Sequence, residues 1–119
     1  MEKTLNLVMP GLDGLEKMKA LMANLRAKPP REIGGSSVLG MRDYQNGTVS
    51  VAELGVVGKT HISGSNVLYF ELEDGTAFIV RPSGTEPKIK VYILTQGADK
   101  AECEARVAKY TSYAEELSK

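Results

Sequence analysis

The feature that most constrains the fold of this chain is an alternating apolar stretch that ends in a tight turn. Every second residue from Leu68 to Leu72 is large and apolar, so these side chains lie on one face of an extended strand. The pair Asp74-Gly75 follows, and it is typical of a two-residue hairpin turn because both residues tolerate positive φ angles. A further strand is predicted over residues 76–80. The segment therefore predicts an antiparallel hairpin with one face against a core.

Two helices are predicted, one near each end of the chain. Asp13 is a suitable N-cap with Glu16 three residues later, and Pro29-Pro30 ends the segment. A second helix is predicted to begin after Asp99. Each helix has apolar residues at helical spacing, namely Leu15, Met18, Met22 and Leu25 in the first and Cys103, Val107, Tyr110, Ala114 and Leu117 in the second. Each therefore has one face suited to covering a sheet.

The remaining elements are strands and loops. Strands are predicted over residues 4–8 and 38–44, and another after the loop that ends at Lys88, with Ile89, Val91 and Ile93 toward the core and Lys88, Lys90 and Tyr92 on the opposite face. Residues 31–37 are predicted as a Gly-Ser loop. We interpret residues 45–64 as a variable excursion with a turn at Asn46-Gly47 and one strand at 48–54. The resulting order is β-α-β-β-β-β-α, an α+β fold with a mainly antiparallel sheet and both helices on one face.

Composition bounds the function classes. The 119 residues are expected to form a single domain over 1–119, with 15 basic and 15 acidic side chains. Zero net charge argues against a general nucleic-acid binder, whose affinity comes mainly from phosphate neutralisation. No apolar run is long enough to span a bilayer, and residues 1–20 do not read as a signal peptide, so no membrane partner is expected. The single cysteine, Cys103, fits a reducing cytoplasm.

One loop carries the chemistry of a phosphate clamp. In the run Arg81–Lys88, Arg81 can direct two N–H donors onto a phosphoryl group, while Ser83 and Thr85 add hydroxyl donors. Gly84 lets consecutive backbone amides converge on one anion. The alternative interpretation of the same residues is a polar β-turn that contains an arginine.

Other motifs are weaker. Residues Gly55–Thr60 look like the end of a nucleotide P-loop, but the first glycine is too close and no helical pattern follows. His61 is the only histidine and has no neighbouring ligands in sequence, so no metal site is predicted. Cys103 is interpreted as a small core residue.

The string RPSGTEPKIKVY, preceded by LEDGTAFIV, closely resembles the C-terminal domain of the α-D-phosphohexomutases, the phosphoglucomutase and phosphomannomutase family. The stretches Thr4–Leu7, Gly11–Gly14, Met22–Arg26 and Asp43-Tyr44 extend the likeness over nearly the whole chain. The resemblance implies a TATA-binding-protein-like fold, β-α-β(4)-α. It also implies that the phosphoryl-carrying serine, the Mg²⁺ loop and the sugar-reading loop lie in preceding domains, so this chain alone is not expected to be catalytic.

The resemblance further implies a role in binding the phosphate that is not being transferred and in closing the active-site cleft. The implied ligands in this chain are Arg81, Ser83, Gly84 and Thr85, with Lys88 or Lys90 adding charge, and Glu86 is expected to point away and brace the loop. The partners would be a hexose phosphate, with glucose, mannose and glucosamine phosphates all open, and the preceding domains. The alternative is a non-enzymatic module that binds an anion or a protein.

Overall fold

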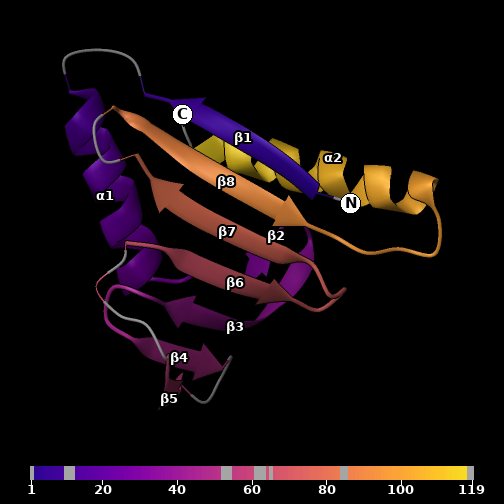
Figure 1. Cartoon of the computed structure of the whole chain (residues 1–119), viewed down its shortest axis with the longest axis horizontal. Coiled ribbons are helices and arrows are strands. Elements are labelled where there is room, and N and C mark those ends of the chain that lie inside the picture. The colour runs from indigo at the N-terminus through magenta and orange to yellow at the C-terminus, as the bar shows by residue number, and fades with distance from the viewer. Residues whose placement is uncertain are drawn as a thin grey trace.

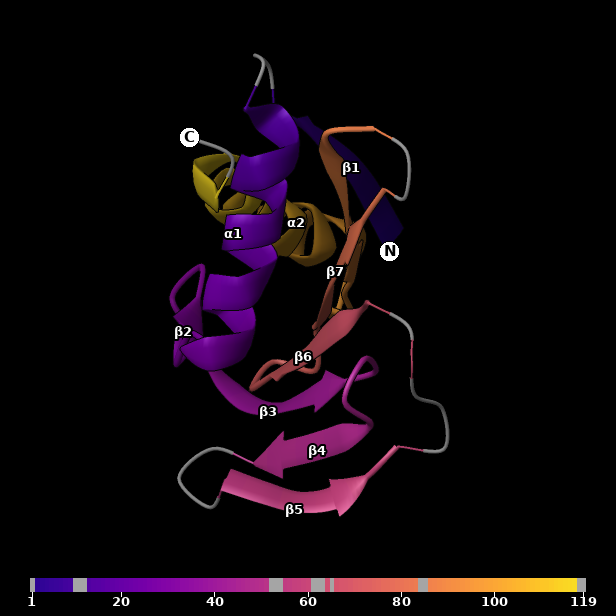
Figure 2. The ribbon, with the colours of Figure 1, turned by 90° about the vertical axis from the view of Figure 1, so that its left-hand side faces the viewer.

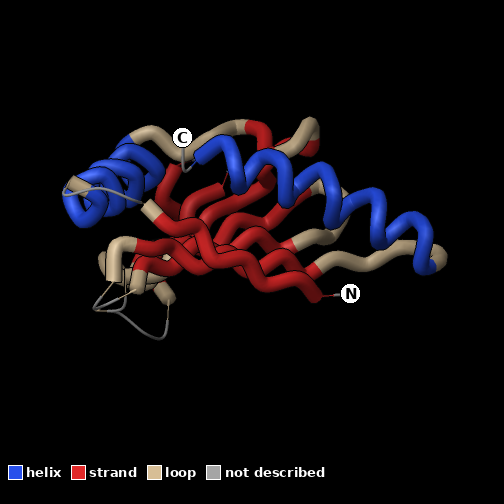
Figure 3. Tube along the Cα trace, turned by 90° about the horizontal axis from the view of Figure 1, so that it is seen from above, coloured by secondary structure: helices blue, strands red, loops and turns tan. Residues whose placement is uncertain are grey.

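The computed structural model describes residues 2–9, 13–51, 55–60, 64, 66–83 and 86–117. In this part of the chain an antiparallel sheet carries two helices on the same face (Figures 1 and 3). The α+β class predicted from the sequence is thus confirmed. The elements are β1 (Glu2–Val8), α1 (Gly14–Ala27), β2 (Glu32–Ile33), β3 (Ser36–Asp43), β4 (Thr48–Val51), β5 (Gly55–Lys59), β6 (Leu68–Leu72), β7 (Ala77–Pro82), β8 (Lys88–Leu94) and α2 (Lys100–Leu117).

The sheet runs in the order β1-β8-β7-β6-β3-β4-β5, with β2 added beside β3. All pairings among these strands are antiparallel. The first strand of the chain therefore lies beside the last strand, as Figure 1 shows for β1 and β8. In Figure 2 the short hairpin of β4 and β5 extends the sheet away from the helices.

The predicted hairpin forms where the alternation placed it, but its turn is longer than the predicted two residues, because residues 73–75 all lie between the bonded residues Leu72 and Thr76. Phe70 of β6 faces Phe78 of β7, and the turn is closed by hydrogen bonds from Leu72 N to Thr76 O at 2.9 Å and from Gly75 N to Leu72 O at 3.0 Å. Gly75 has φ 86°, the left-handed region that glycine occupies without a Cβ clash. The turn residues thus fix the register of the two central strands.

The sheet has three short strands more than the predicted order. Residues 31–37 are not only a loop, because β2 and the start of β3 form a hairpin around Gly34 and Gly35, whose φ angles are 56° and 85°. A Cβ on Gly34 would lie 2.8 Å from the Tyr110 ring, so glycine is required there for close approach as well. The excursion at 45–64 holds β4, which ends at Val51 rather than at 54, and the additional strand β5.

The core lies between the sheet and the helices. Phe70, Phe78 and Tyr110 are its largest fully buried side chains. Most of the predicted helical stripes are buried or partly buried, but Leu15 is 49% exposed and does not belong to the core. The remaining core members from the strands include Leu68, Leu72, Val80, Ile89, Val91 and Ile93.

The two helix starts differ from each other. Asp99 accepts a hydrogen bond from Glu102 N at 2.8 Å, and Glu102 accepts one from Ala98 N at 2.9 Å, so α2 has a reciprocal cap. Asp13 occupies the predicted N-cap position of α1, but its side chain makes no capping hydrogen bond and instead lies 3.7 Å from Lys17 Nζ. Neither helix, over its described residues, is long and apolar enough to cross a membrane.

Candidate phosphate-binding loop

The candidate loop joins β7 to β8 at one end of the sheet. Arg81 pairs with Lys90 across the two strands, and Ser83 N donates a hydrogen bond to Lys88 O at 2.9 Å. These contacts hold Ser83 next to the start of β8. Gly84 and Thr85, which sequence analysis also assigned to the clamp, lie outside the described residues.

The cationic side chains share the face of the sheet that the helices leave open. Ile89, Val91 and Ile93 are fully buried, as predicted, and the intervening residues of β8 therefore point to the other face. Arg81 and Asn6 flank Lys90 in the register, so the three side chains project on the same side. The structure thus brings together Arg81, Lys88 and Lys90 beside the loop.

Glu86 braces the loop from within. Its carboxylate lies 3.4 Å from Lys88 Nζ, and its backbone N–H donates to Ser83 Oγ at 3.3 Å. The side chain of Glu86 is 62% exposed, so this ion pair is screened by water and can be exchanged for another anion at small cost. Arg81, in contrast, makes no ion pair with any residue that the structure describes.

The start of α1 supports the same loop, which sequence analysis did not predict. Met9 N donates to Pro87 O at 2.8 Å. A Cβ built on Gly14 would lie 2.2 Å from Met9 O and 3.0 Å from Pro87 Cβ. Only glycine allows this approach of the helix to the loop, and the signal available in the sequence was the glycine at the head of a helix.

The other motifs do not form sites in the described part of the chain. Gly55–Lys59 is an edge strand paired with β4, not a phosphate loop that opens a helix. His61 lies outside the described residues. Among the described residues, no three His, Cys, Asp or Glu side chains gather in a way that could hold Mg²⁺ or another metal ion.

Comparison with known proteins agrees with the resemblance seen in the sequence. Residues 5–109 match the family described as phosphoglucomutase/phosphomannomutase, C-terminal domain. A phosphoglucomutase of Staphylococcus aureus strain N315 is 39% identical over 84 residues, which is 70% of this chain and 15% of the relative. The phosphoglucomutase of strain MW2 is 38% identical over the same shares. The match thus spans only a small part of these relatives' length. Because the family model matches residues 5–109, the chain belongs to the phosphoglucomutase/phosphomannomutase C-terminal domain family.

Proposed function

We propose that this domain binds, through the β7–β8 loop, the phosphate of a hexose phosphate that is not being transferred in a phosphohexomutase reaction. The observation that carries the proposal is the convergence of Arg81 and Lys90, paired across β7 and β8, with Lys88 at the loop end. The relatives named phosphoglucomutase supply the reaction class, an intramolecular phosphoryl transfer. We expect the protein to act in the cytoplasm together with the preceding domains of the same enzyme.

Each residue has a separate role in the proposed site. Arg81 presents a planar guanidinium that can donate two parallel hydrogen bonds to one phosphate. Ser83 contributes a hydroxyl, and Gly84 and Thr85 contribute backbone amides, with the Thr85 hydroxyl as a further donor. Lys90 adds charge beside Arg81, and Lys88 does so once the phosphate has displaced the exposed carboxylate of Glu86. The dianion thus replaces a weak, solvent-screened partner.

A fixed phosphate anchor has a clear use in such a reaction. The sugar must present first one end and then the other to the same phosphoryl donor, so one phosphate has to be held while the other reacts. Binding by this domain would also close the cleft and exclude water. The groups that transfer the phosphoryl lie elsewhere in the enzyme, and this chain alone is expected to give no turnover with glucose 1-phosphate.

Phosphate titration tests the proposal on this chain directly. Inorganic phosphate or glucose 1-phosphate should bind with a dissociation constant on the order of 1 mM or weaker, because one loop supplies only part of a closed site. The backbone amide signals of Ser83, Gly84 and Thr85 should shift most in an NMR titration. Arg81→Lys keeps the charge but loses the planar fork, so it should weaken binding clearly, whereas Glu86→Gln should strengthen it by removing a competing anion.

Arg42→Lys is the matched control, because Arg42 lies on the open face of the sheet, next to Tyr69 and away from the β7–β8 loop. It should leave phosphate affinity unchanged. The proposal would be refuted if phosphate shifted signals elsewhere and spared residues 81–88, or if Arg42→Lys weakened binding as much as Arg81→Lys. Either result would mean that the loop is only a turn.

A further inference from the structure

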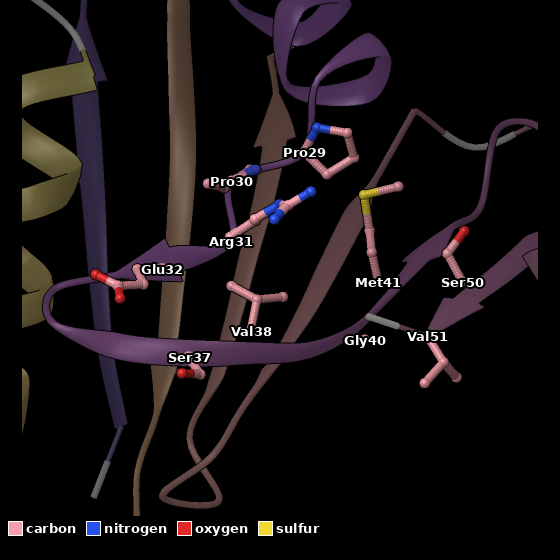
Figure 4. Close-up of a pocket in the computed structure, with 10 residues that line it drawn as sticks. All are labelled: Pro29, Pro30, Arg31, Glu32, Ser37, Val38, Gly40, Met41, Ser50 and Val51. Carbon is pink, nitrogen blue, oxygen red and sulfur yellow. The ribbon is translucent and has the colours of Figure 1, made fainter. Parts of the chain in front are cut away.

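A cavity lies at the other end of α1 from the phosphate loop. It has a volume of about 550 Å³ and is bounded by the segment that follows α1, by β3 and by β4 (Figure 4). Val38 and Met41 form a buried apolar floor, each 7% exposed, and Pro29 extends the apolar surface. This volume is in the range of small-molecule sites, which are mostly apolar with few polar groups.

One wall of the cavity is formed by β4, which lies within the strand predicted over residues 48–54. Ser50 and Val51 belong to β4, which pairs with β3 at Gly40 and Met41. A Cβ on Gly40 would lie 2.9 Å from Ser50 O, so glycine lets β4 approach β3 closely here. The β4 strand thus turns an open sheet edge into a walled cavity.

One cation projects into this apolar space. Figure 4 shows the Arg31 side chain extending toward Met41, while the carboxylate of Glu32 points the other way. Arg31 is exposed and forms no ion pair with another described residue. Its backbone is fixed, because Arg31 O accepts a hydrogen bond from Val38 N at 2.8 Å. A guanidinium beside apolar surface suits a ligand with one anionic group and an apolar body.

We propose that this cavity is a binding site for a small monocarboxylate with an aromatic or branched apolar body. The carboxylate would receive two hydrogen bonds from Arg31, and the apolar body would lie on Val38 and Met41. Ser50 offers a further polar contact from the β4 wall. A phosphate ester suits the cavity less well, because its two charges would face a single guanidinium. This site is separate from the proposed phosphate loop and does not depend on it.

Phenylacetate and its uncharged analogue phenylacetamide test the proposal as a pair. Phenylacetate should bind the chain with a dissociation constant on the order of 1 mM and shift NMR signals of Val38, Met41, Ser50 and Val51. Arg31→Gln should weaken phenylacetate binding about tenfold and leave the weak binding of phenylacetamide unchanged, because only the acid uses the guanidinium. Arg42→Gln removes a guanidinium from the opposite face of β3 and should have no effect.

Ser50→Phe provides a second, independent variant, since this partly exposed residue of the β4 wall points to the same side as Met41 in Figure 4 and a larger side chain there would fill the cavity. It should abolish the shifts caused by both compounds at Val38 and Met41. Equal binding of the acid and the amide, unchanged acid affinity in Arg31→Gln, or shifts confined to residues 81–90 would overturn the proposal. The last outcome would place the carboxylate at the phosphate loop instead.

Discussion

The Tyr110 hydroxyl should be worth about 2 kcal/mol of folding stability at neutral pH. Tyr110 is fully buried in α2, and its hydroxyl donates to Asp74 Oδ2 and lies 2.7 Å from Ser36 Oγ. Tyr110→Phe keeps the ring but removes one charge-assisted and one neutral hydrogen bond. Part of the loss is offset, because Thr76 N still donates to Asp74 and Lys109 Nζ still donates to Ser36. The balance is about 2 kcal/mol, or a melting temperature about 8 °C lower for a domain of this size.

The same substitution should change the pH dependence of stability. Burial acts to raise the pKa of Asp74, but hydrogen bonds from Tyr110 and Thr76 and the charge of Arg106 outweigh it, so the pKa lies below its ordinary value. A lowered pKa means that the stabilisation is present above the unfolded-state value of about 3.9 and is lost as pH falls through the folded-state value. The difference between wild type and Tyr110→Phe should therefore be larger at pH 7 than at pH 3.

Urea unfolding followed by circular dichroism at the two pH values measures both effects. Tyr113→Phe is the matched control, because Tyr113 lies in the same helix, packs edge-on against Phe78 with 5.8 Å between the ring centroids, and its hydroxyl makes no hydrogen bond with another described residue. It should change stability by less than about 0.5 kcal/mol. A loss below that value for Tyr110→Phe at pH 7, or a loss of equal size at pH 3, would refute the inferred Tyr110–Asp74 contact.

Two further substitutions test the ends of α1. Arg26→Gln should lower the free energy of unfolding in urea by about 3 kcal/mol, because Asp43 is 2% exposed and Arg26 Nε lies 2.9 Å from its carboxylate. The double variant with Asp43→Asn should lose less stability than the sum of the two single variants, and strictly additive losses would contradict the ion pair. Gly14→Ala should lower the free energy of unfolding by about 2 kcal/mol and shift the amide signals of residues 86–88. Gly58→Ala is the control and should be nearly neutral, because a Cβ there would meet nothing within 4 Å. Equal melting temperatures for the two variants would contradict the contact with Pro87.

Local patterns in the sequence were sufficient for the central strands and both helices. Leu68, Phe70 and Leu72 alternate over a stretch that ends in a turn pair, and that information is contained in neighbouring residues. The strands β2 and β5 were missed, and β4 was predicted three residues too long, for the opposite reason. They are short and are stabilised by pairing with a neighbouring strand, β2 with β3 and β5 with β4, rather than by their own periodicity.

The residues of the candidate loop could be predicted from the sequence, but the contacts that hold the loop in place could not. Arg81, Ser83 and Lys88 stand close together in the sequence, so their convergence follows from one hairpin. The contacts of Pro87 with Met9 and Gly14 join distant segments, and no local pattern carries that information. Leu15 shows the same limit, because helical spacing predicted a core position and the end of the sheet leaves that residue exposed.

The two α1 contacts give a physical reason for the separate stretches that carry the family resemblance. Gly14 lies in one of them and makes room for the loop that holds Pro87, while Arg26 and Asp43 lie in two others and form a buried ion pair with each other. Asp43 also accepts hydrogen bonds from Gln45 N at 3.1 Å and from Asn46 Nδ2 at 2.9 Å, so the pair fixes the turn after β3. The helix is thus tied at its first residue to the loop and at its last turn to the sheet. Because these contacts hold the loop in place, the phosphate binding that we propose for it would need less ordering of the chain.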